Sequence, residues 1–467
     1  MTTYEPEPWR IKMVEPIRAT TRAHRERAIR AAGWNPCLLR AEDVHIDLFT
    51  DSGTNAMSDR QWSALMRGDE AYAGARSFYV LEQAVREHYG YPHVVPVHQG
   101  RGGEAILSRC LLGPGTHVPG NMYFPTTRAH QELNGATFHD VIVDEAHDPV
   151  SEHPFKGDVD LDKLRALVEE VGADAIPCVS VAATVNMAGG QPISVGNLTA
   201  VCELAHAHGI PVFLDAARAV ENAWFVKQRE PGWGDKSVAE ILHALCAPTD
   251  GAVVSAKKDG LANIGGWVGL RDADLADRVR AEALLYEGLH TYGGMAGRDM
   301  EAIAQGIAES VDEEHIRSRV AQVEYLGARL RNAGVPVVRP FGGHCVCVDA
   351  AATLPHIPRG QFPGQTLAAA LYVVGGVRGV ERGGVSAGRD PRTGDNRTPA
   401  LELLRLAVPR RVYTRCHIDH VADSVIKVHQ EREEITSGLV FSHEPPVLRF
   451  FQARFAPAGG ESIFGRS

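Results

Sequence analysis

The chain has 467 residues, enough to bury a substantial core and to form two or more lobes. Its 48 basic and 58 acidic residues give a net charge of −10, which argues against a nucleic-acid partner or an anionic membrane partner. Eight cysteines are scattered without paired metal-ligand spacing, which is typical of free thiols in a reducing compartment. Residues 1–10 lack the apolar stretch of a signal peptide, and no run approaches the roughly 20 apolar residues of a membrane span. We therefore expect a cytoplasmic protein.

Apolar strand-like runs alternate with helical patterns from about Ser77 to Arg271, which predicts a mainly parallel sheet. The first chemical signal in this region is a glycine-rich turn, His-Gln-Gly-Arg-Gly-Gly-Glu-Ala at 98–105, between the apolar stretch 94–97 and a helical pattern at 105–112. Glycines let backbone N–H groups reach a phosphate at the positive N-terminus of a helix, and Arg101 adds charge. Such a turn alone is more often only a tight turn, so it needs support from elsewhere in the chain.

Two further strand ends supply that support. The apolar run at 210–214 ends in Asp215, with Arg218 three positions later, and the run 252–254 leads into the doublet Lys257-Lys258. A lysine doublet alone usually forms a solvated face. In an open parallel sheet, however, ligands bind outside the carboxyl ends of the strands. A lysine that forms a Schiff base, an aspartate for a pyridinium nitrogen and a phosphate turn together indicate pyridoxal phosphate (PLP).

The second half of the chain begins with a long amphipathic helix. Apolar residues recur at helical spacing from Ile316 to Leu330, and Gly334 is its stop signal, so we expect a helix that bridges two lobes. The run around Cys345 and Cys347 is interpreted as a half-buried strand rather than a metal site. A Gly/Asp/Arg-rich stretch at 383–397 is expected to form a mobile loop. The predicted domains are residues 1–56 (an arm and part of the small domain), 57–311 (the large PLP-binding domain) and 312–467 (the bridging helix and the rest of the small domain).

Eight short runs, in order along the chain, resemble one known family. The chain resembles the β-eliminating lyases, the family of the tyrosine phenol-lyases and tryptophan indole-lyases, over nearly its whole length. The runs are Asp51–Ser58, Gly68–Gly74, His98–Gly102, Gly120–Phe124, Ala188–Pro192, Glu221–Ala223, Ser255–Asp259 and Arg405–Tyr413. The resemblance implies an α/β protein with the aminotransferase-like fold of PLP enzymes, fold type I, with a mainly parallel seven-stranded sheet in the large domain and a smaller α/β domain.

The resemblance also implies roles for the residues in these runs. Lys258 is expected to carry the cofactor as a Schiff base and to take the α-proton of the substrate, with Lys257 beside it. Asp215 would pair with the pyridinium nitrogen. The other residues expected at the cofactor are Phe124 on its ring, Asn186 and Arg218 at its phenolic oxygen, and Gln99, Gly100, Arg101 and Ser255 at its phosphate.

Substrate and cation residues are implied in the same way. Arg405, Thr50 and Ser52 would bind the substrate carboxylate, and Tyr72 would protonate the ring carbon that leaves. The resemblance further implies a monovalent cation site, favouring potassium, formed by Gly53, Glu70 and Asn263. It also implies a homotetramer built as a dimer of dimers with sites at the dimer interface.

The leaving ring is expected to be a phenol. Arg382 resembles the arginine that faces the phenol hydroxyl in the phenol-lyases, and Phe450-Phe451 also favours that branch. The pocket departs from the phenol-lyase pattern at Pro125, where a threonine is usual, at Cys37, where a phenylalanine is usual, and at Leu289-His290. Losing a hydroxyl removes a hydrogen bond worth about 0.5–1.5 kcal/mol, and losing an aromatic wall opens space.

We therefore expect a lyase that acts on an aromatic L-amino acid, either tyrosine or a ring-substituted tyrosine, and gives a phenol, pyruvate and ammonia. Three alternatives stay open at this point: tryptophan indole-lyase activity; β-elimination from S-substituted cysteine or another PLP reaction such as transamination; and a catalytically idle cofactor-binding or regulatory protein.

Overall fold

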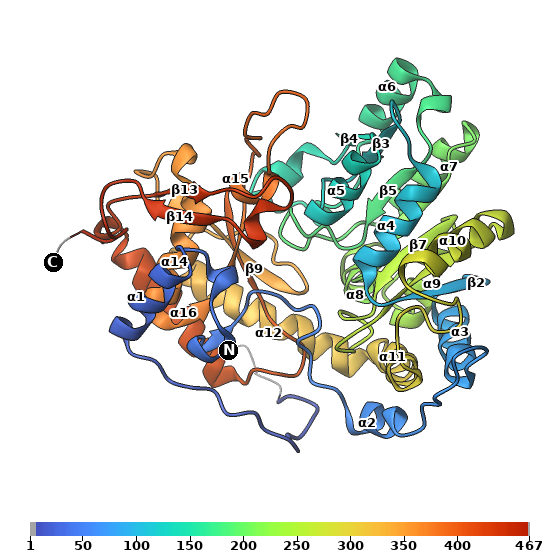
Figure 1. Ribbon diagram of the computed structural model, residues 1–467, viewed down its shortest axis with the longest axis horizontal. Coiled ribbons are helices and arrows are strands. Elements are labelled where there is room, and N and C mark those ends of the chain that lie inside the picture. The colour runs from blue at the N-terminus through green and yellow to red at the C-terminus, as the bar shows by residue number, and fades with distance from the viewer. Residues whose placement is uncertain (1–5, 466–467) are drawn as a thin grey trace. The chain divides into compact units, whose positions relative to one another are not determined.

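The computed structural model describes residues 6–465, so the signal-peptide expectation for residues 1–10 falls partly outside the described residues. The chain divides into two compact units (Figure 1). Among the described residues, we call 52–146 and 153–319 the large unit, and 6–51, 147–152 and 320–465 the small unit. Among the helices that the structure describes, none combines the length and apolar character that a membrane crossing requires.

The large unit is built on a seven-stranded sheet with the order β2-β8-β7-β6-β5-β3-β4. In this order the strands are His93–Val97, Gly266–Leu270, Gly251–Ser255, Val212–Asp215, Val179–Ala182, His117–Gly120 and Thr137–Asp140. Strand β8 is antiparallel to both β2 and β7, and the pairs from β7 to β4 are all parallel. Helices cover both faces of such a sheet, so its central strands are continuous apolar runs. The expected mainly parallel seven-stranded sheet is confirmed.

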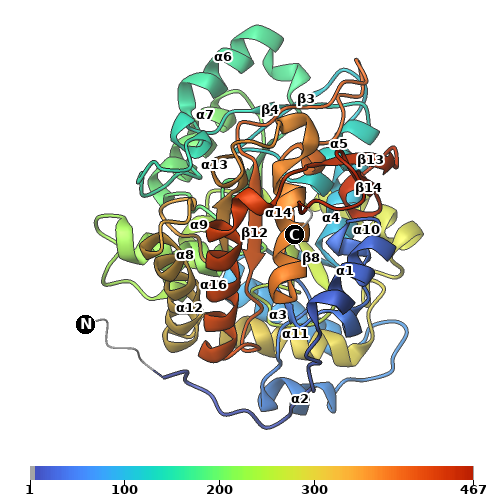
Figure 2. The same cartoon turned by 90° about the vertical axis from the view of Figure 1, so that its left-hand side faces the viewer.

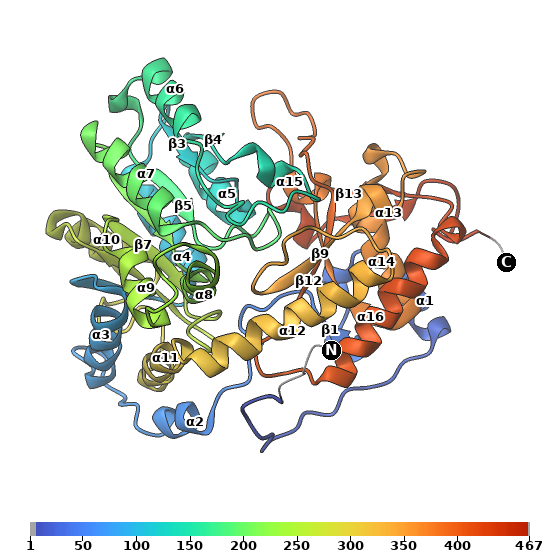
Figure 3. The same ribbon diagram turned by 180° about the vertical axis from the view of Figure 1, so that it is seen from behind.

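Helices α4 (Gly100–Leu111) and α10 (Ala273–Tyr286) pack on the sheet, where Ile106 and Val279 share one apolar core with Phe213 and Val253. Figure 1 shows α4 and α5 (Pro125–Leu133) over this face, and Figure 3 shows α7 (Val195–Ala207) and α9 (Val238–Cys246) over the other. The remaining helices of eight or more residues that lie wholly in this unit are α3 (Arg76–Tyr89), α6 (Leu161–Val171), α8 (Ala219–Arg229) and α11 (Gly297–Ser310), and α2 (Asp59–Leu65) is shorter.

The small unit contains a three-stranded antiparallel sheet in the order β11 (Val380–Arg382), β12 (Leu403–Ala407), β9 (Cys345–Asp349). Figure 2 shows this unit with α12 (Glu313–Asn332) beside α16 (Arg415–Gln430); Arg329 of α12 pairs with Asp419 of α16 at 2.6 Å. The other elements are α1 (Arg22–Ala31), α13 (Ala350–Thr353), α14 (Pro363–Gly375), α15 (Gly384–Ala387), the pair β1 (Ile46–Asp47) and β10 (Val377–Arg378), and the pair β13 (Leu439–His443) and β14 (Arg454–Pro457).

Two predictions about single elements can be compared with this fold. The amphipathic helix is confirmed as α12, whose apolar positions from Ile316 to Leu330 are buried, and the boundary between the units falls inside it. The half-buried strand is wrong in one respect, because Cys345 to Val348 are each at most 2% exposed. Core side chains cover one face of β9 and Val337 pairs with its free edge, so it is buried throughout its first four residues. The predicted domain ranges and the mobility of residues 383–397 stay predictions.

Candidate functional site

The glycine-rich turn forms the N-terminus of α4. Gln99 is the N-cap, and the helix begins at Gly100, earlier than the pattern at 105–112 suggested, so three glycines lie in its first turn. A Cβ on Gly100 would lie 2.8 Å from the Cβ of Ser255, which ends β7. The backbone of the first turn therefore packs directly against the end of β7. The first N–H groups of a helix have no partner within the helix and favour an anion, so this turn is suited to a phosphate.

The lysine doublet occupies a tight turn after β7. The N–H of Lys258 donates to the carbonyl of Ser255 at 3.2 Å, and the N–H of Leu261 donates to the carbonyl of Lys258 at 2.9 Å. The ammonium of Lys257 donates to Oε1 of Gln99 at 3.2 Å. Burial, and then the charge of Arg101, lower the pKa of Lys257. The structure thus joins the lysine turn to the N-terminus of α4.

Asp215 and Arg218 lie on the turn between β6 and α8. Oδ1 of Asp215 accepts a hydrogen bond from the N–H of Ala217 at 3.1 Å, and Arg218 is the N-cap of α8 and 5% exposed. Asp259 holds the first turn of the same helix by accepting from the N–H of Val220 at 2.9 Å. The neighbouring strand β5 leads to a loop in which Asn186 is 7% exposed. These turns follow the carboxyl ends of adjacent parallel strands, as the sequence predicted.

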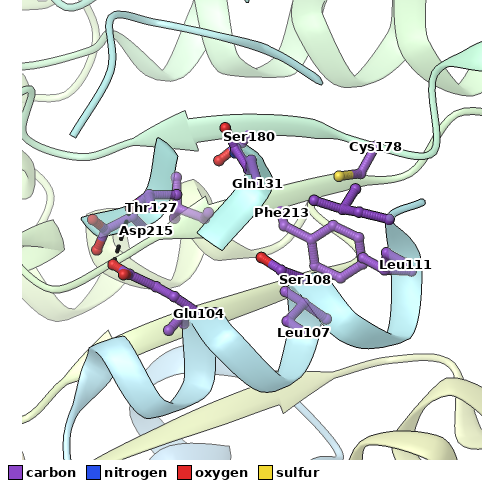
Figure 4. A pocket seen from close by; sticks show the side chains of 13 residues that line it. Glu104, Leu107, Ser108, Leu111, Thr127, Gln131, Cys178, Ser180, Phe213 and Asp215 are labelled. Carbon is purple, nitrogen blue, oxygen red and sulfur yellow. Dashed lines mark hydrogen bonds between the residues drawn. The ribbon is translucent and has the colours of Figure 1, made fainter. Parts of the chain in front are cut away.

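A cavity of about 50 Å³ lies between α4, α5 and the sheet, large enough for a few water molecules. Figure 4 shows Glu104, Thr127 and Asp215 at one end and apolar side chains at the other. The carboxylate of Glu104 accepts hydrogen bonds from the hydroxyls of Thr126 at 2.8 Å and Thr127 at 3.0 Å. Burial, and then the charge of Asp215, raise the pKa of Glu104. Sequence reasoning missed Glu104, although it belongs to the glycine-rich turn and is the acidic residue there.

The remaining residues expected around the ring lie in loops of the large unit or at the start of one of its helices. Phe124 is the N-cap of α5, and Pro125 is its first residue. Leu289 lies in the loop between α10 and α11. Tyr72 lies in the loop between α2 and α3, and 72% of its surface is exposed. Its ring lies 5.2 Å from the ring of Tyr292, and a hydrogen bond with Tyr292 raises the pKa of Tyr72. In this chain the expected acid is therefore open to solvent.

Two of the three expected cation ligands come together. Nδ2 of Asn263 donates to the carbonyls of Gly53 at 3.1 Å and Asn55 at 2.9 Å. Glu70 instead pairs with Arg298 at 3.6 Å, and its side chain is largely exposed. Among the described residues, no three histidine, cysteine, aspartate or glutamate side chains are arranged to hold a metal ion.

In the small unit, Arg382 and Arg405 lie on the same face of the antiparallel sheet. Arg405 pairs with Val380, two residues before Arg382, so the two arginines are diagonal neighbours on one face. Arg405 is 3% exposed and donates to the carbonyl of Phe49, next to Thr50, at 2.9 Å. On β9, Cys347 pairs with Arg405, and a hydrogen bond with Cys345, with the charges of Arg405 and Arg382, lowers the pKa of Cys347.

Arg382 is 4% exposed and lies over the ring of Phe450, with 5.2 Å from its guanidinium carbon to the ring centroid. Phe450 in turn lies 4.0 Å from the ring of Phe451. Burial raises the pKa of Cys37, and the charges of Arg378 and then Arg382 oppose that shift. The structure therefore groups Arg382, Phe450 and Cys37, which the sequence assigned to one substrate pocket.

Sequence reasoning missed two buried charge networks that the structure reveals. Asp51 and Arg410, each in a family-like run, form an ion pair at 3.1 Å and are at most 1% exposed. Glu381 and Glu402 lie buried beside the turn that follows Arg382, and no motif pointed to them. A signal was available for Arg410 and Glu402, because a charged residue inside an apolar run, as at 401–410, usually has a buried partner.

One protein family matches most of this chain. The family model described as β-eliminating lyase matches residues 47–424. A tyrosine phenol-lyase of Symbiobacterium sp. (strain SC-1) is 60% identical over 97% of this chain and 98% of that protein. Those of Nostoc punctiforme (60%; 96% of each chain) and Intrasporangium calvum (59%; 98% of this chain and 96% of that protein) are similar to the same degree.

Solved structures show the fold at lower identity. A serine palmitoyltransferase from Sphingomonas wittichii superposes with a TM-score of 0.54 at 16% identity, covering 83% of this chain and 88% of that one. A structure of SPT with PLP gives a TM-score of 0.57 at 17% identity, covering 88% of this chain and 96% of that one. The chain thus has the type I fold of PLP-dependent enzymes that the sequence predicted.

Proposed function

Since the chain belongs to the β-eliminating lyase family and is a carbon–carbon lyase, we propose that it removes the ring of L-tyrosine, or of a ring-substituted tyrosine, as a phenol. The other products are pyruvate and ammonia. The observation that carries this proposal is the identity of about 60% to tyrosine phenol-lyases along almost the whole chain.

The family and fold support pyridoxal phosphate as the cofactor, and the large unit offers groups that fit it. Its phosphate is assigned to the first turn of α4 with Gln99, Gly100, Arg101 and Ser255. A Cβ at position 100 would fill this cradle. We assign the pyridinium nitrogen to Asp215, the phenolic oxygen to Asn186 and Arg218, and the ring face to Phe124. When bound, PLP supplies an electrophilic carbonyl for the substrate amine and an electron-withdrawing ring.

We assign the two proton transfers of the reaction to Lys258 and Tyr72. The amine of Lys258, once released by the substrate, takes the α-proton. Lys257, whose ammonium donates to Gln99, is assigned to the phosphate end of the site and not to the α-proton. Tyr72 delivers a proton to the ring carbon attached to the β-carbon, which makes the ring a leaving group. The raised pKa of Tyr72 keeps its proton in place at neutral pH.

Arg405 of β12, together with Thr50 and Ser52, is assigned to the substrate carboxylate on the family resemblance. A bidentate arginine fits a carboxylate well. Arg382 is assigned to the phenolic oxygen, to which its guanidinium donates hydrogen bonds. Its positive charge favours transfer of the phenolic proton to water as the ring carbon is protonated. The guanidinium lies over the ring of Phe450, which in turn contacts the ring of Phe451.

Cys37, Pro125 and Leu289 bear on which ring fits best. The thiol of Cys37 is small and lies near Arg382, and Pro125 offers no hydroxyl to a phenol. A substituted ring with an extra hydroxyl or methyl group could use the space that these side chains leave. We therefore include ring-substituted tyrosines in the proposed substrate class.

The proposal also covers a bound cation, the oligomeric state and the cellular compartment. A potassium ion would use Gly53, Glu70 and Asn263, which requires Glu70 to leave Arg298. The enzyme is proposed to be a homotetramer, and the exposure of Tyr72 together with exposed apolar side chains such as Leu285 and Tyr286 supports a covered surface on the large unit. Eight free cysteines support a reducing compartment such as the cytoplasm.

The test is a substrate panel with the purified enzyme and added PLP. Tyrosine, ring-substituted tyrosines, tryptophan and S-methylcysteine are supplied in parallel, pyruvate is measured, and the released fragment is identified. Phenol from tyrosine, or a substituted phenol, is the expected result. Indole from tryptophan alone would move the enzyme to the indole branch, and pyruvate from S-methylcysteine alone would remove the ring-expelling step.

A further inference from the structure

Two buried carboxylates hold the turn that follows Arg382. Oε1 of Glu381 accepts from the N–H of Val385 at 2.9 Å, and its Oε2 accepts from the N–H of Ser386 at 2.9 Å. Oε2 of Glu402 accepts from the N–H of Gly384 at 3.0 Å. Three consecutive backbone donors of α15 thus go to two side chains that are 1% and 3% exposed.

A buried arginine holds the opposite side of the same turn. Arg449, 3% exposed, donates to the carbonyls of Gly384 at 2.6 Å and Val385 at 3.1 Å. Arg449 also pairs with Glu444 at 2.5 Å. It directly precedes Phe450, so the side chain that binds the turn and the ring that lies under Arg382 are consecutive in the chain.

The turn bears directly on Arg382. Nη1 of Arg382 donates to the carbonyl of Glu381 at 3.1 Å and to Oγ of Ser386 at 3.3 Å. Ser386 Oγ in turn donates to Oε2 of Glu381 at 2.6 Å. Any shift of the turn therefore moves an acceptor of the guanidinium.

We propose that Glu381 and Glu402 are positioning residues that lock the Gly384–Ser386 turn and thereby fix the guanidinium of Arg382 for recognition of a hydroxylated aromatic ring. The inference deepens the proposed function and rests on it for the role of Arg382. Neither carboxylate is assigned contact with substrate.

The charges around the pair agree with this role. Burial raises the pKa of both Glu381 and Glu402, and the charge of Glu381 adds to the shift of Glu402. The positive charge of Arg382 opposes the shift at Glu381, and that of Arg359 opposes the shift at Glu402.

The experiment measures kcat/KM for tyrosine and for S-methylcysteine, whose small leaving group needs no phenol recognition. Glu381→Gln replaces an acceptor oxygen with an amide and should lower the tyrosine to S-methylcysteine ratio at least about tenfold, the scale of one charge-assisted hydrogen bond. Glu402→Gln should lower the ratio in the same direction by a smaller factor, because the pKa of Glu402 is raised to about 8. Ser386→Ala provides a milder variant and should lower the ratio in the same direction. Glu230→Gln is the matched control, because Glu230 likewise accepts from two N–H groups of a helix start, those of Val195 and Gly196, and it should leave the ratio unchanged.

A second cycle asks whether the pair acts through Arg382. In an Arg382→Ala background, Glu381→Gln should cause no further fall in the ratio. A further fall of the same size in that background would overturn the positioning role, because the effect would then bypass Arg382.

Hydrogen exchange of the peptide that spans Gly384–Ser386 reports on the turn without any substrate. Faster exchange in both glutamine variants with an unchanged substrate ratio would overturn the inference alone. If the wild-type enzyme releases pyruvate from S-methylcysteine but from no hydroxylated aromatic amino acid, the proposed function fails, and the inference about Arg382 fails with it.

Discussion

The pKa of a buried acid in the small unit depends on the groups around it in space more than on its neighbours in sequence. Glu402 stands in an otherwise apolar run, 401–408, with Arg405 as the other charged residue, and it is 3% exposed. Burial, and then the charge of Glu381, raise its pKa to about 8. At neutral pH the folded protein therefore holds a neutral carboxyl at this position.

The pKa of Glu402 gives a pH dependence with a defined sign. The folded pKa lies above that of an unfolded chain, about 4.5, so the stabilisation is complete below the unfolded pKa and is lost as the pH rises through about 8. Between pH 5 and 8 the free energy of unfolding should fall with pH by up to about 1.4 kcal/mol per pH unit from this group. Urea unfolding of wild type and Glu402→Gln across this range measures the difference. Parallel pH profiles for the two proteins would contradict the assignment, because glutamine does not titrate.

At the scale of elements, the close approach between α4 and β7 suits the first turn of α4 to the phosphate proposed to bind there. Three glycines in the first turn remove side chains that would separate the helix from the strand. The turn of Asp215 before α8 and the lysine turn after β7 follow the ends of the adjacent strands β6 and β7. Together with the first turn of α4, these turns carry the groups proposed to bind the cofactor.

Gly100→Ala tests that approach. The new Cβ would lie 2.8 Å from the Cβ of Ser255, a distance that real Cβ atoms essentially never show, so helix and strand must separate and phosphate affinity must fall. We expect the dissociation constant of PLP, measured from the fluorescence of apoenzyme titrated with cofactor, to rise at least about tenfold, equivalent to about 1.4 kcal/mol. Gly113→Ala, just beyond the other end of α4 with nothing within 4 Å of its Cβ, is the matched control and should leave the affinity unchanged. Equal affinities for the two variants would contradict a cradle at Gly100.

At the scale of the whole molecule, buried ion pairs tie together segments far apart in the chain. Glu221 of α8 and Arg319 of α12 pair at 3.2 Å with side chains 0% and 2% exposed. Lys227 and Glu313 link the same two helices at 3.0 Å, but their side chains are 21% and 45% exposed. The same helix pair thus carries one desolvated bridge and one hydrated bridge.

Glu221→Gln and Glu313→Gln separate these two cases. Removing one partner of the buried pair should lower the free energy of unfolding by about 3–5 kcal/mol, because Arg319 then keeps a buried charge without its counter-ion. Removing Glu313 should cost less than about 1 kcal/mol, since water screens and replaces the pair. Guanidinium unfolding followed by circular dichroism measures both. Similar losses for the two variants would show that burial does not control the strength of these bridges.

Much of the fold could be predicted from the sequence. The buried strands, the parallel sheet and α12 follow from periods of hydrophobicity that any isolated stretch reveals, and Lys258, Asp215 and the α4 turn follow from polar residues placed at strand ends. The burial of β9 was missed because alternation in sequence cannot report what packs on a strand's second face. Glu104 was missed because its importance depends on Thr126, Thr127 and Asp215, which only folding brings near it.

The sequence by itself determined the family, the type I fold and the chemical groups available to a PLP lyase, because those depend on local patterns and on runs of matching residues. Only the tertiary structure decided how those groups are held. It placed Arg382 between Phe450 and a turn held by Glu381, Glu402 and Arg449, and it raised the pKa of both acids through burial. The physical reason is that hydrogen-bond partners and desolvation depend on which groups lie close in space. Residues far apart in the sequence, such as Arg382 and Phe450, become neighbours only on folding.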